Sequence, residues 1–386
     1  MTSYYFILGR ENKISQKEVE VVLASFGFGL ISDSTSIIAE DILEIKLNAG
    51  SPEIAGLMNI LGGTVKIYQK IAPVDEKLTS LLVKENMSKK LIFGLSNYSG
   101  KQIDAFGLAL SAKKEIKKPL RIIAGKENNR LSSAQSFQYK MDIENVEYGL
   151  FDTGVGKLIA TQNIDEWTRH DYGKPRSDAR SGMLPPKLAR VMVNLALGQI
   201  GPISPIRLIC VDPFCGSGNV LIEALSLGCD INGSDSSDKA VLDSRINVDW
   251  FLSGRKLKAA VSKQDATKYD FNKINRDFVV VTEPYLGQPR NHKLTIEEEK
   301  EAKEDTRRLY EDFLKNLLTT NCRLKAICLV FPLFELANGK KLSIFDQCID
   351  FIRKIGYTLV CPPMEYGRDY QVVKREIVLL KLSADS

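Results

Sequence analysis

The sequence predicts an α/β protein in which a mostly parallel sheet occupies the C-terminal half and smaller α+β units precede it. From residue 206 onward, strand-like apolar runs alternate with helical patterns, and such alternation is typical of a parallel sheet covered by helices. The first seventy residues have the order β-α-β-β-α-β, which is that of a ferredoxin-like unit. The length of 386 residues favours two or three domains at ~150 residues each.

The first unit combines four short strands with two helices. Its strands are expected over residues 4–8, 37–39, 42–47 and 65–71. The pair Ser15 and Glu18 precedes apolar residues at helical spacing, which is typical of a capping box and predicts that a helix begins there. A second helix is expected over residues 51–61, because Ser-Pro opens this segment and Gly-Gly follows it.

A charged connector over residues 75–90 leads to a second α+β unit. Its strands are expected over residues 91–95, 121–123, 146–151 and 158–162. Between residues 113 and 130 the chain carries seven Lys or Arg residues against two acids. This basic cluster permits an RNA-binding surface, although a solvated helix face explains the charges equally well when they are taken alone.

The chain then becomes polar and turn-rich around residues 171–176, which indicates a linker. The last two strand-like runs, residues 357–361 and 375–382, have no helical pattern between them. They should pair antiparallel at the sheet edge, because a parallel pair needs a long crossover. The predicted domains are residues 1–75, residues 76–165, a linker at 166–184, and residues 185–386.

Composition excludes several classes of protein. The net charge of +5 permits a nucleic-acid partner but does not require one. Seven cysteines include no Cys-x-x-Cys pair and there are two histidines, so we expect buried thiols and no metal site. No segment has the ~18 apolar residues of a membrane span, and the N-terminus lacks a signal-peptide pattern, which favours the cytoplasm.

The most informative stretch is residues 212–219, Asp-Pro-Phe-Cys-Gly-Ser-Gly-Asn, which lies between two apolar runs. This order predicts a strand, a glycine turn and a helix whose N-terminus points at a ligand. Leu221 stands where the dinucleotide fingerprint needs a third glycine, and no lysine of a phosphate-binding loop follows. The turn therefore disfavours a dehydrogenase and suits a ligand with an ammonium group and no phosphate, such as S-adenosylmethionine.

Two further acids are expected at strand ends. Asp235 follows Asp212 by 23 residues, near the ~20-residue interval at which a Rossmann-type acid meets ribose hydroxyls. Asp265 ends the predicted third strand, where its side chain can accept a hydrogen bond from an adenine amino group. A role as a turn or cap residue explains Asp265 as well.

Residues 282–285, Thr-Glu-Pro-Tyr, follow the fourth predicted strand at residues 278–281. Amino methyltransferases of nucleic acids carry Asp/Asn-Pro-Pro-Tyr/Phe at this place. An exocyclic amino group is a poor nucleophile, because its lone pair is delocalised into the base. Hydrogen-bond acceptors at this position localise that lone pair and orient the nitrogen. Tyr285 is expected to stack on a base taken out of its helix, unless Pro-Tyr simply closes the strand.

With these two motifs, the chain resembles the THUMP-domain tRNA methyltransferases of the guanine-N2 group, especially the archaeal and eukaryotic enzymes acting on guanosine 10. The likeness extends to residues 131–135, 170–175, 180–189 and 366–377. It implies a Rossmann-like methyltransferase domain with an antiparallel last strand, preceded by ferredoxin-like and THUMP-like domains. It also implies S-adenosylmethionine as cofactor and tRNA as partner, with neither a membrane nor a metal.

The resemblance also assigns roles to particular residues. It implies cofactor contacts by Asp212, Phe214, Gly216, Gly218, Asp235 and Asp265, catalytic positions at Thr282, Glu283, Pro284 and Tyr285, and RNA contacts by Lys117, Lys118 and Arg121.

One departure stands out, because Thr282 replaces the family's Asp and an acid appears one residue later. Thr282 is then a neutral acceptor, or Glu283 moves into the site, or another amino group is preferred, or activity is impaired. Methylation of an amino group in rRNA or DNA, and RNA binding without catalysis, stay open as alternatives.

Overall fold

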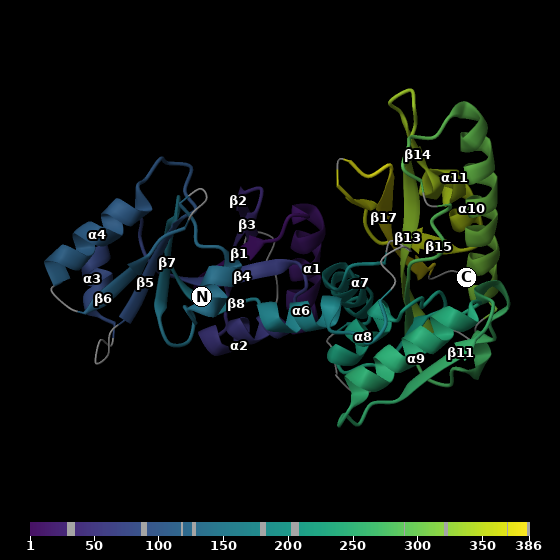
Figure 1. Ribbon diagram of the computed structural model, residues 1–386, viewed down its shortest axis with the longest axis horizontal. Helices are drawn as coiled ribbons and strands as arrows, with labels where there is room; N and C mark the ends of the chain where they lie inside the picture. Colours follow the sequence, from purple (N-terminus) through teal and green to yellow (C-terminus); the bar gives the residue numbers. More distant parts are fainter. Residues whose placement is uncertain are drawn as a thin grey trace. The chain divides into compact units, whose positions relative to one another are not determined.

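The computed structural model describes residues 1–28, 35–85, 91–116, 119–125, 129–177, 183–201, 208–288, 290–319, 323–368 and 370–383. The chain divides into two compact units, Met1–Trp167 and Thr168–Ser386. Each unit contains its own sheet (Figure 1).

The N-terminal unit is built on an eight-stranded sheet. Its strands are β1 (Thr2–Leu8), β2 (Thr35–Ala39), β3 (Ile42–Leu47), β4 (Thr64–Ala72), β5 (Leu91–Asn97), β6 (Leu120–Ile123), β7 (Val146–Phe151) and β8 (Gly154–Thr161). They lie in the order β2-β3-β1-β4-β8-β7-β5-β6. β5 runs parallel to β6 and β7, and the other neighbouring pairs are antiparallel.

Short helices accompany this sheet. They are α1 (Asn12–Ser25), α2 (Ser51–Gly56), the 3-10 turn η1 (Leu57–Asn59), α3 (Leu78–Val83), α4 (Ala105–Ile116), α5 (Ser133–Gln138) and α6 (Ile164–Tyr172), which spans the boundary between the units. The element order β1-α1-β2-β3-α2-β4 is the predicted β-α-β-β-α-β order.

The predicted start of the first helix at Ser15 is wrong. α1 begins at Asn12, and Ser15 lies inside it with its hydroxyl donating to the Glu11 carbonyl at 3.0 Å. Glu18 is buried and accepts the backbone N–H groups of Gly62 and Gly63 at 2.8 and 2.7 Å. The Ser-x-x-Glu pattern therefore fixes the turn before β4 instead of capping the helix.

The two predicted N-terminal domains share one sheet. β8 pairs with β4 on one side and with β7 on the other. Strands from residues 1–75 and from residues 76–165 consequently belong to a single compact unit, although the connector between them contains the expected helix, α3.

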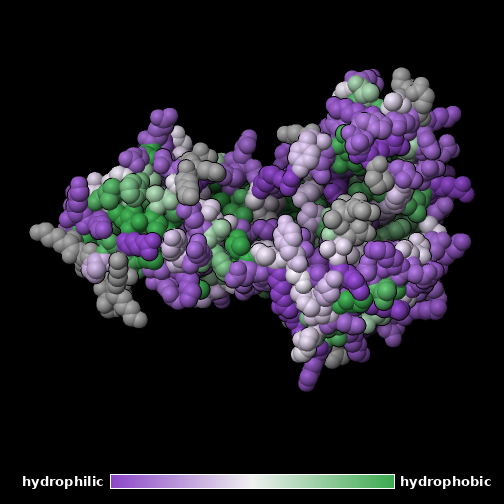
Figure 2. Space-filling view, in the orientation of Figure 1, coloured by the Kyte–Doolittle hydropathy of each residue, from purple (hydrophilic) through white to green (hydrophobic). Residues whose placement is uncertain are grey.

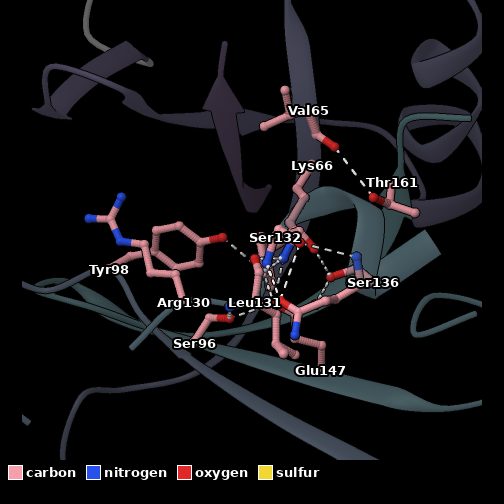
Figure 3. Close-up of polar contacts among 12 residues, drawn as sticks. Val65, Lys66, Ser96, Tyr98, Arg130, Leu131, Ser132, Ser136, Glu147 and Thr161 are labelled. Atoms are coloured by element: carbon pink, nitrogen blue, oxygen red, sulfur yellow. Dashed lines mark hydrogen bonds and ion pairs between the residues drawn. The ribbon is translucent and has the colours of Figure 1, made fainter. Parts of the chain in front are cut away.

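A cluster of buried polar side chains lies at the centre of this unit (Figure 3). Glu147 of β7 is fully buried, and one of its oxygens accepts hydrogen bonds from Lys66 Nζ at 2.7 Å, the Tyr68 hydroxyl at 2.6 Å and the Ser96 hydroxyl at 2.6 Å. The other oxygen accepts the Ser136 hydroxyl at 2.5 Å. Because a buried charge is costly unless it is paired and hydrogen-bonded, these partners are what make Glu147 tolerable here.

The same cluster fixes the chain just before α5. Lys66 Nζ donates to the Leu131 carbonyl at 2.8 Å, and the Leu131 N–H donates to the Ser96 hydroxyl at 2.9 Å. Ser132 then caps α5 through the N–H of Gln135. Residues 131–135, which carry part of the family resemblance, are thus held from below by a buried network.

The C-terminal unit is a sheet of mostly parallel strands with helices beside it. Its elements are α7 (Pro186–Leu197), β9 (Ile209–Asp212), α8 (Asn219–Ser226), β10 (Asp230–Asp235), α9 (Asp238–Leu252), β11 (Ala259–Lys263), η2 (Ala266–Lys268), η3 (Phe271–Lys273), β12 (Phe278–Thr282), α10 (Ile296–Leu317), β13 (Leu324–Glu335), β14 (Lys341–Ser343), α11 (Ile344–Lys354), β15 (Tyr357–Leu359), β16 (Met364–Tyr366) and β17 (Val373–Leu382).

The main strand order in this sheet is β11-β10-β9-β12-β13-β17-β15. The pairs from β11 to β13 are parallel, and β17 is antiparallel to both β13 and β15. The predicted parallel sheet with an antiparallel last strand is therefore confirmed. The order reverses at β9, and open α/β sheets bind ligands at such a switch point, beyond the carboxyl ends of the strands.

The core of the unit packs α10 and α11 against β12, β13 and β17. Five of the described cysteines are buried thiols, Cys361 is partly exposed, and Cys322 lies outside the described residues. Among the described residues, no cluster of His, Cys, Asp or Glu is arranged to hold a metal ion. None of the described helices is long and apolar enough to cross a bilayer.

Candidate cofactor and active site

A cavity of about 680 Å³ opens at the carboxyl ends of β9, β10 and β12, which is within the size range of small-molecule sites. It is lined by residues 212–217, 219–220, 235–236, 265–266 and 283–287, together with Met183, Leu184 and Leu309. The structure thus brings together both predicted motifs and both predicted strand-end acids.

The glycine turn between β9 and α8 needs glycine for conformational reasons. Gly216 and Gly218 have φ angles of +50° and +87°, in the left-handed region that other residues rarely adopt. A Cβ atom at Gly218 would also lie 2.8 Å from the Ser244 hydroxyl of α9. Gly218 therefore sets the entry to α8, and close approach of a ligand to its backbone stays a prediction.

Asp212 ends β9 and is almost completely buried. Its Oδ1 accepts the Thr282 hydroxyl at 2.5 Å and the Phe214 N–H at 3.2 Å. Burial raises the pKa of Asp212 to about 7, and the charges of Asp235 and Glu283 add to this shift while the two hydrogen bonds oppose it. A carboxyl group that changes charge near neutral pH thus lies under the glycine turn.

The strand-end acids differ in their surroundings. Asp235 accepts the Gly216 N–H at 3.0 Å and the Ser237 N–H at 2.9 Å, one on each oxygen. Asp265 uses one oxygen for both the N–H and the hydroxyl of Thr267, at 2.9 and 2.8 Å, and its side chain is half exposed. The Thr267 hydroxyl is the main cause of its lowered pKa. Asp265 is thus a cap of η2 that also lines the cavity, and its contact with adenine stays a prediction.

The Thr-Glu-Pro-Tyr segment separates its two polar side chains. Thr282 is fully buried and directs its hydroxyl to Asp212. Glu283 lines the cavity, and its Oε1 accepts Nε–H of Arg375 from β17 at 2.5 Å. Burial raises the pKa of Glu283, and the Arg375 guanidinium opposes this shift.

The last two residues of the segment form part of the cavity wall. Pro284 is buried, whereas the Tyr285 side chain is about half exposed. Phe214, on the glycine turn, lies edge-on to Phe313 of α10 with ring centroids 5.2 Å apart. Tyr285 thus has the exposure that stacking on a base requires.

The predicted linker is firmly attached to the C-terminal unit in its described part. Lys174 is buried and donates to the side-chain oxygen of Asn219, whose amide in turn donates to the Leu184 carbonyl at 2.6 Å. Asn247 of α9 bonds both backbone groups of Arg176, at 2.9 and 2.8 Å. The polar composition that indicated a linker here reflects these contacts, and only the likeness of residues 170–175 to the family signalled them.

Arg375 is the site residue that sequence reasoning did not identify. It appeared only as part of the C-terminal stretch that resembles the family, 92 residues from Glu283. Because the contact depends on how β12, β13 and β17 are ordered in the sheet, no local pattern predicts it.

The predicted RNA contacts are only partly described. Arg121 lies in β6, with its guanidinium 5.7 Å from the centre of the Tyr139 ring, and Lys117 and Lys118 lie outside the described residues. Apolar side chains gather on the surface of this unit near α3 and α4, where Phe106 and Leu108 are exposed (Figure 2). RNA binding by Lys117, Lys118 and Arg121 stays a prediction.

Known proteins resemble this chain over part of its length. A tRNA (guanine(10)-N2)-dimethyltransferase of Methanothermobacter thermautotrophicus is 26% identical over 183 residues, which is 46% of this chain and 48% of that protein. The enzyme of the same name from Methanocaldococcus jannaschii is 32% identical over 112 residues, 28% of this chain and 29% of that protein. The chain thus matches about half the length of these curated relatives, or less.

A solved structure shows the same fold over nearly the whole chain. TrmN from Thermus thermophilus aligns with a TM-score of 0.53 at 13% identity, covering 98% of this chain and 99% of that one. The family model that matches is UPF0020, an RMKL-like methyltransferase domain, over residues 174–332. These residues contain the glycine turn, the strand-end acids and the Thr-Glu-Pro-Tyr segment, and the C-terminal unit therefore carries a methyltransferase domain of the RMKL-like UPF0020 family.

Proposed function

We propose that this protein transfers a methyl group from S-adenosylmethionine to the exocyclic N2 amino group of a guanine in tRNA. The observation that carries the proposal is the cavity at the switch point of the sheet, where the glycine turn, Asp212, Asp235 and the Thr-Glu-Pro-Tyr segment meet within a methyltransferase domain. The printed names of the relatives support tRNA and guanine N2, and a tRNA substrate favours the cytoplasm.

The residues present fit the cofactor. Each Asp235 oxygen accepts one backbone N–H and retains a lone pair for a ribose hydroxyl. Asp212 offers a carboxylate to an ammonium group, Phe214 offers an apolar surface, and Gly216 lies on the cavity wall. When bound, S-adenosylmethionine supplies an electrophilic methyl group on its sulfonium.

The chain's own contribution is to hold the acceptor base. Tyr285 provides a ring for stacking, and acceptors near residues 282–284 orient the amino group. The amino nitrogen uses its lone pair for the new N–C bond, the electron pair of the broken C–S bond stays on sulfur, and a proton then leaves the nitrogen. Pre-set acceptors favour this step, because they draw the lone pair out of the base.

One observation favours the second candidate, an RNA-binding protein impaired in catalysis. Thr282, at the position of the family's first acid, bonds Asp212 and is fully buried. If that position is indispensable, the domain binds its cofactor and RNA without transferring the methyl group.

Nucleoside mass spectrometry separates these functions. Unmodified tRNA is incubated with the protein and isotope-labelled S-adenosylmethionine, with Gly218→Val as the cofactor-binding control. We expect labelled N2-methylated guanosine. Labelled N6-methyladenosine would retain the chemistry and overturn the substrate base, whereas tRNA binding without any labelled nucleoside would support the impaired binder.

A further inference from the structure

The ion pair between Glu283 and Arg375 spans one strand of the C-terminal sheet. Glu283 follows β12, and Arg375 lies in β17 opposite Pro332 of β13, the strand between them. Nε and Nη2 of Arg375 lie 2.5 and 3.4 Å from the two Glu283 oxygens. The two side chains are only 8% and 14% exposed, so the guanidinium holds the carboxylate in a nearly dry setting.

The carboxylate is paired but not saturated. A carboxylate has about four lone-pair positions, and the hydrogen bonds described for Glu283 both come from Arg375. Its remaining exposed surface belongs to the cavity wall that also contains Pro284 and Tyr285. An amino group beside Tyr285 would therefore find acceptor positions on this side chain.

Thr282 cannot take this role in the observed arrangement. Its side chain is fully enclosed, and its hydroxyl hydrogen is directed to Asp212 at 2.5 Å. Within the Thr-Glu-Pro-Tyr segment, Glu283 is consequently the acidic side chain that faces the cavity.

We propose that Glu283 is the carboxylate that accepts the hydrogens of the target amino group, and that Arg375 is the positioning residue that aims it into the cavity. This inference rests on the proposed function and specifies how the altered motif performs it. Glu283 holds the amino group while its nitrogen forms the bond to the methyl carbon, and it lies within the cavity to receive the proton that the nitrogen releases. Thr282 then positions Asp212.

Three groups of the described chain act on the Glu283 charge from different elements. They are Arg375 from β17, the Tyr310 hydroxyl from α10 and Asp212 from β9. Arg375 favours the anion, whereas burial and the negative charge of Asp212 favour the protonated form. Removing Arg375 should therefore raise the pKa of Glu283 and move the acidic limb of the rate profile to higher pH.

The test measures single-turnover methylation of tRNA, at saturating tRNA and cofactor, as a function of pH. We expect Glu283→Gln to slow the step by about 100-fold or more, as for loss of a proton-accepting group. Arg375→Gln should slow it at neutral pH and shift the acidic limb upward, and Arg375→Lys should restore part of both. Lys374→Gln is the matched control, because this neighbouring buried cation pairs with Glu335 and Glu365, outside the cavity wall.

A second measurement does not depend on turnover. The Glu283 carboxyl is followed by ¹³C NMR titration, assigned by its absence in Glu283→Gln, and its pKa should rise in Arg375→Gln. Thermal melts and cofactor affinity of each variant show whether the fold is kept.

The outcomes are distinguishable. Wild-type methylation with an unchanged rate in Glu283→Gln, or an unchanged pH profile in a folded Arg375→Gln, overturns this inference and leaves the proposed function standing. Absence of any methylated nucleoside with the wild-type protein overturns the proposed function itself, and this inference with it.

Discussion

Each unit of the protein buries an ion pair between strands that are far apart in the sequence, and the two pairs differ in what surrounds them. Lys66 and Glu147 lie 2.7 Å apart with side chains at most 2% exposed, and Glu147 accepts four hydrogen bonds from described side chains. Glu283 and Arg375 lie 2.5 Å apart at the wall of a cavity. A saturated pair fixes structure, whereas an unsaturated pair at a cavity has capacity for a ligand.

The pKa shifts point the same way. Burial alone lowers the pKa of Lys66, but Tyr98 and Glu147 reverse this, so its pKa is raised and the cation is kept. For Glu283, burial outweighs Arg375 and the pKa of the acid rises. The N-terminal pair therefore keeps its charge over a wide pH range, and the C-terminal carboxyl lies closer to protonation.

The largest effect is expected from breaking the saturated pair. Glu147→Ala leaves Lys66 as a buried cation without its anion, and such losses cost about 3–5 kcal/mol of unfolding free energy. Urea unfolding of the full chain measures this. Glu144→Ala is the control, since the Lys140–Glu144 pair is more than half exposed and pairs of that kind contribute at most about 1 kcal/mol. Equal losses in both variants would erase the distinction between the two pairs.

Next in size is the loss of cofactor binding in Gly218→Val. This change places a branched side chain at φ +87° and against Ser244, which should displace the turn that carries the cavity wall. Calorimetry should show binding of S-adenosylmethionine abolished while circular dichroism stays native. Gly228→Ala is a suitable control, because Gly228 has φ +84° but no atom within 4 Å of the added Cβ. Retained affinity in both Gly218→Val and Asp235→Ala would remove the cofactor assignment.

A pH effect of intermediate size should come from Asp212. Its folded pKa of about 7 means that the group is protonated below pH 7 and charged above it. If its carboxylate meets the cofactor ammonium, affinity should rise as pH increases to about 7 and then level off, by up to tenfold per pH unit. Calorimetry from pH 5 to pH 8 measures this. Asp212→Asn should bind weakly with a flat profile, and a wild-type profile that is equally flat would contradict the assignment.

A smaller loss is expected from Tyr285→Ala. Stacking on a base contributes ~1–3 kcal/mol, so turnover on tRNA should fall while cofactor affinity is nearly kept. Tyr370→Ala removes another exposed tyrosine, 72% exposed, that does not line the cavity. If both variants methylate tRNA at the wild-type rate, the base is held elsewhere.

The smallest change concerns the N-terminal unit. Charge removal at Lys117, Lys118 and Arg121 together should weaken tRNA binding and flatten its salt dependence by roughly 0.7–0.9 log units per lost phosphate contact. Cofactor affinity should stay unchanged. A triple variant with the wild-type salt slope would make this cluster an ordinary solvated surface.

The sequence predicted what depends on short segments. Strand periodicity and the glycine turn placed Asp212, Asp235 and Asp265 correctly beside one cavity, because the carboxyl ends of parallel strands meet at one edge. It failed where distant residues decide. Ser15 and Glu18 have the spacing of a cap, yet Glu18 bonds a turn 44 residues away. Arg375 and the Lys66–Glu147 pair likewise depend on strand order, which no local pattern contains.

The position of β8 between β4 and β7 has a consequence for the protein during its synthesis. β4 ends at residue 72 and β8 begins at residue 154, so the ribosome adds about 80 residues between them, which takes roughly 4–16 s at ~5–20 residues per second. Throughout that interval the emerging N-terminal strands have an unpaired edge at β4, and free strand edges promote aggregation. The nascent chain is therefore most exposed to misassembly, and most dependent on chaperones, just before residue 161 leaves the ribosome.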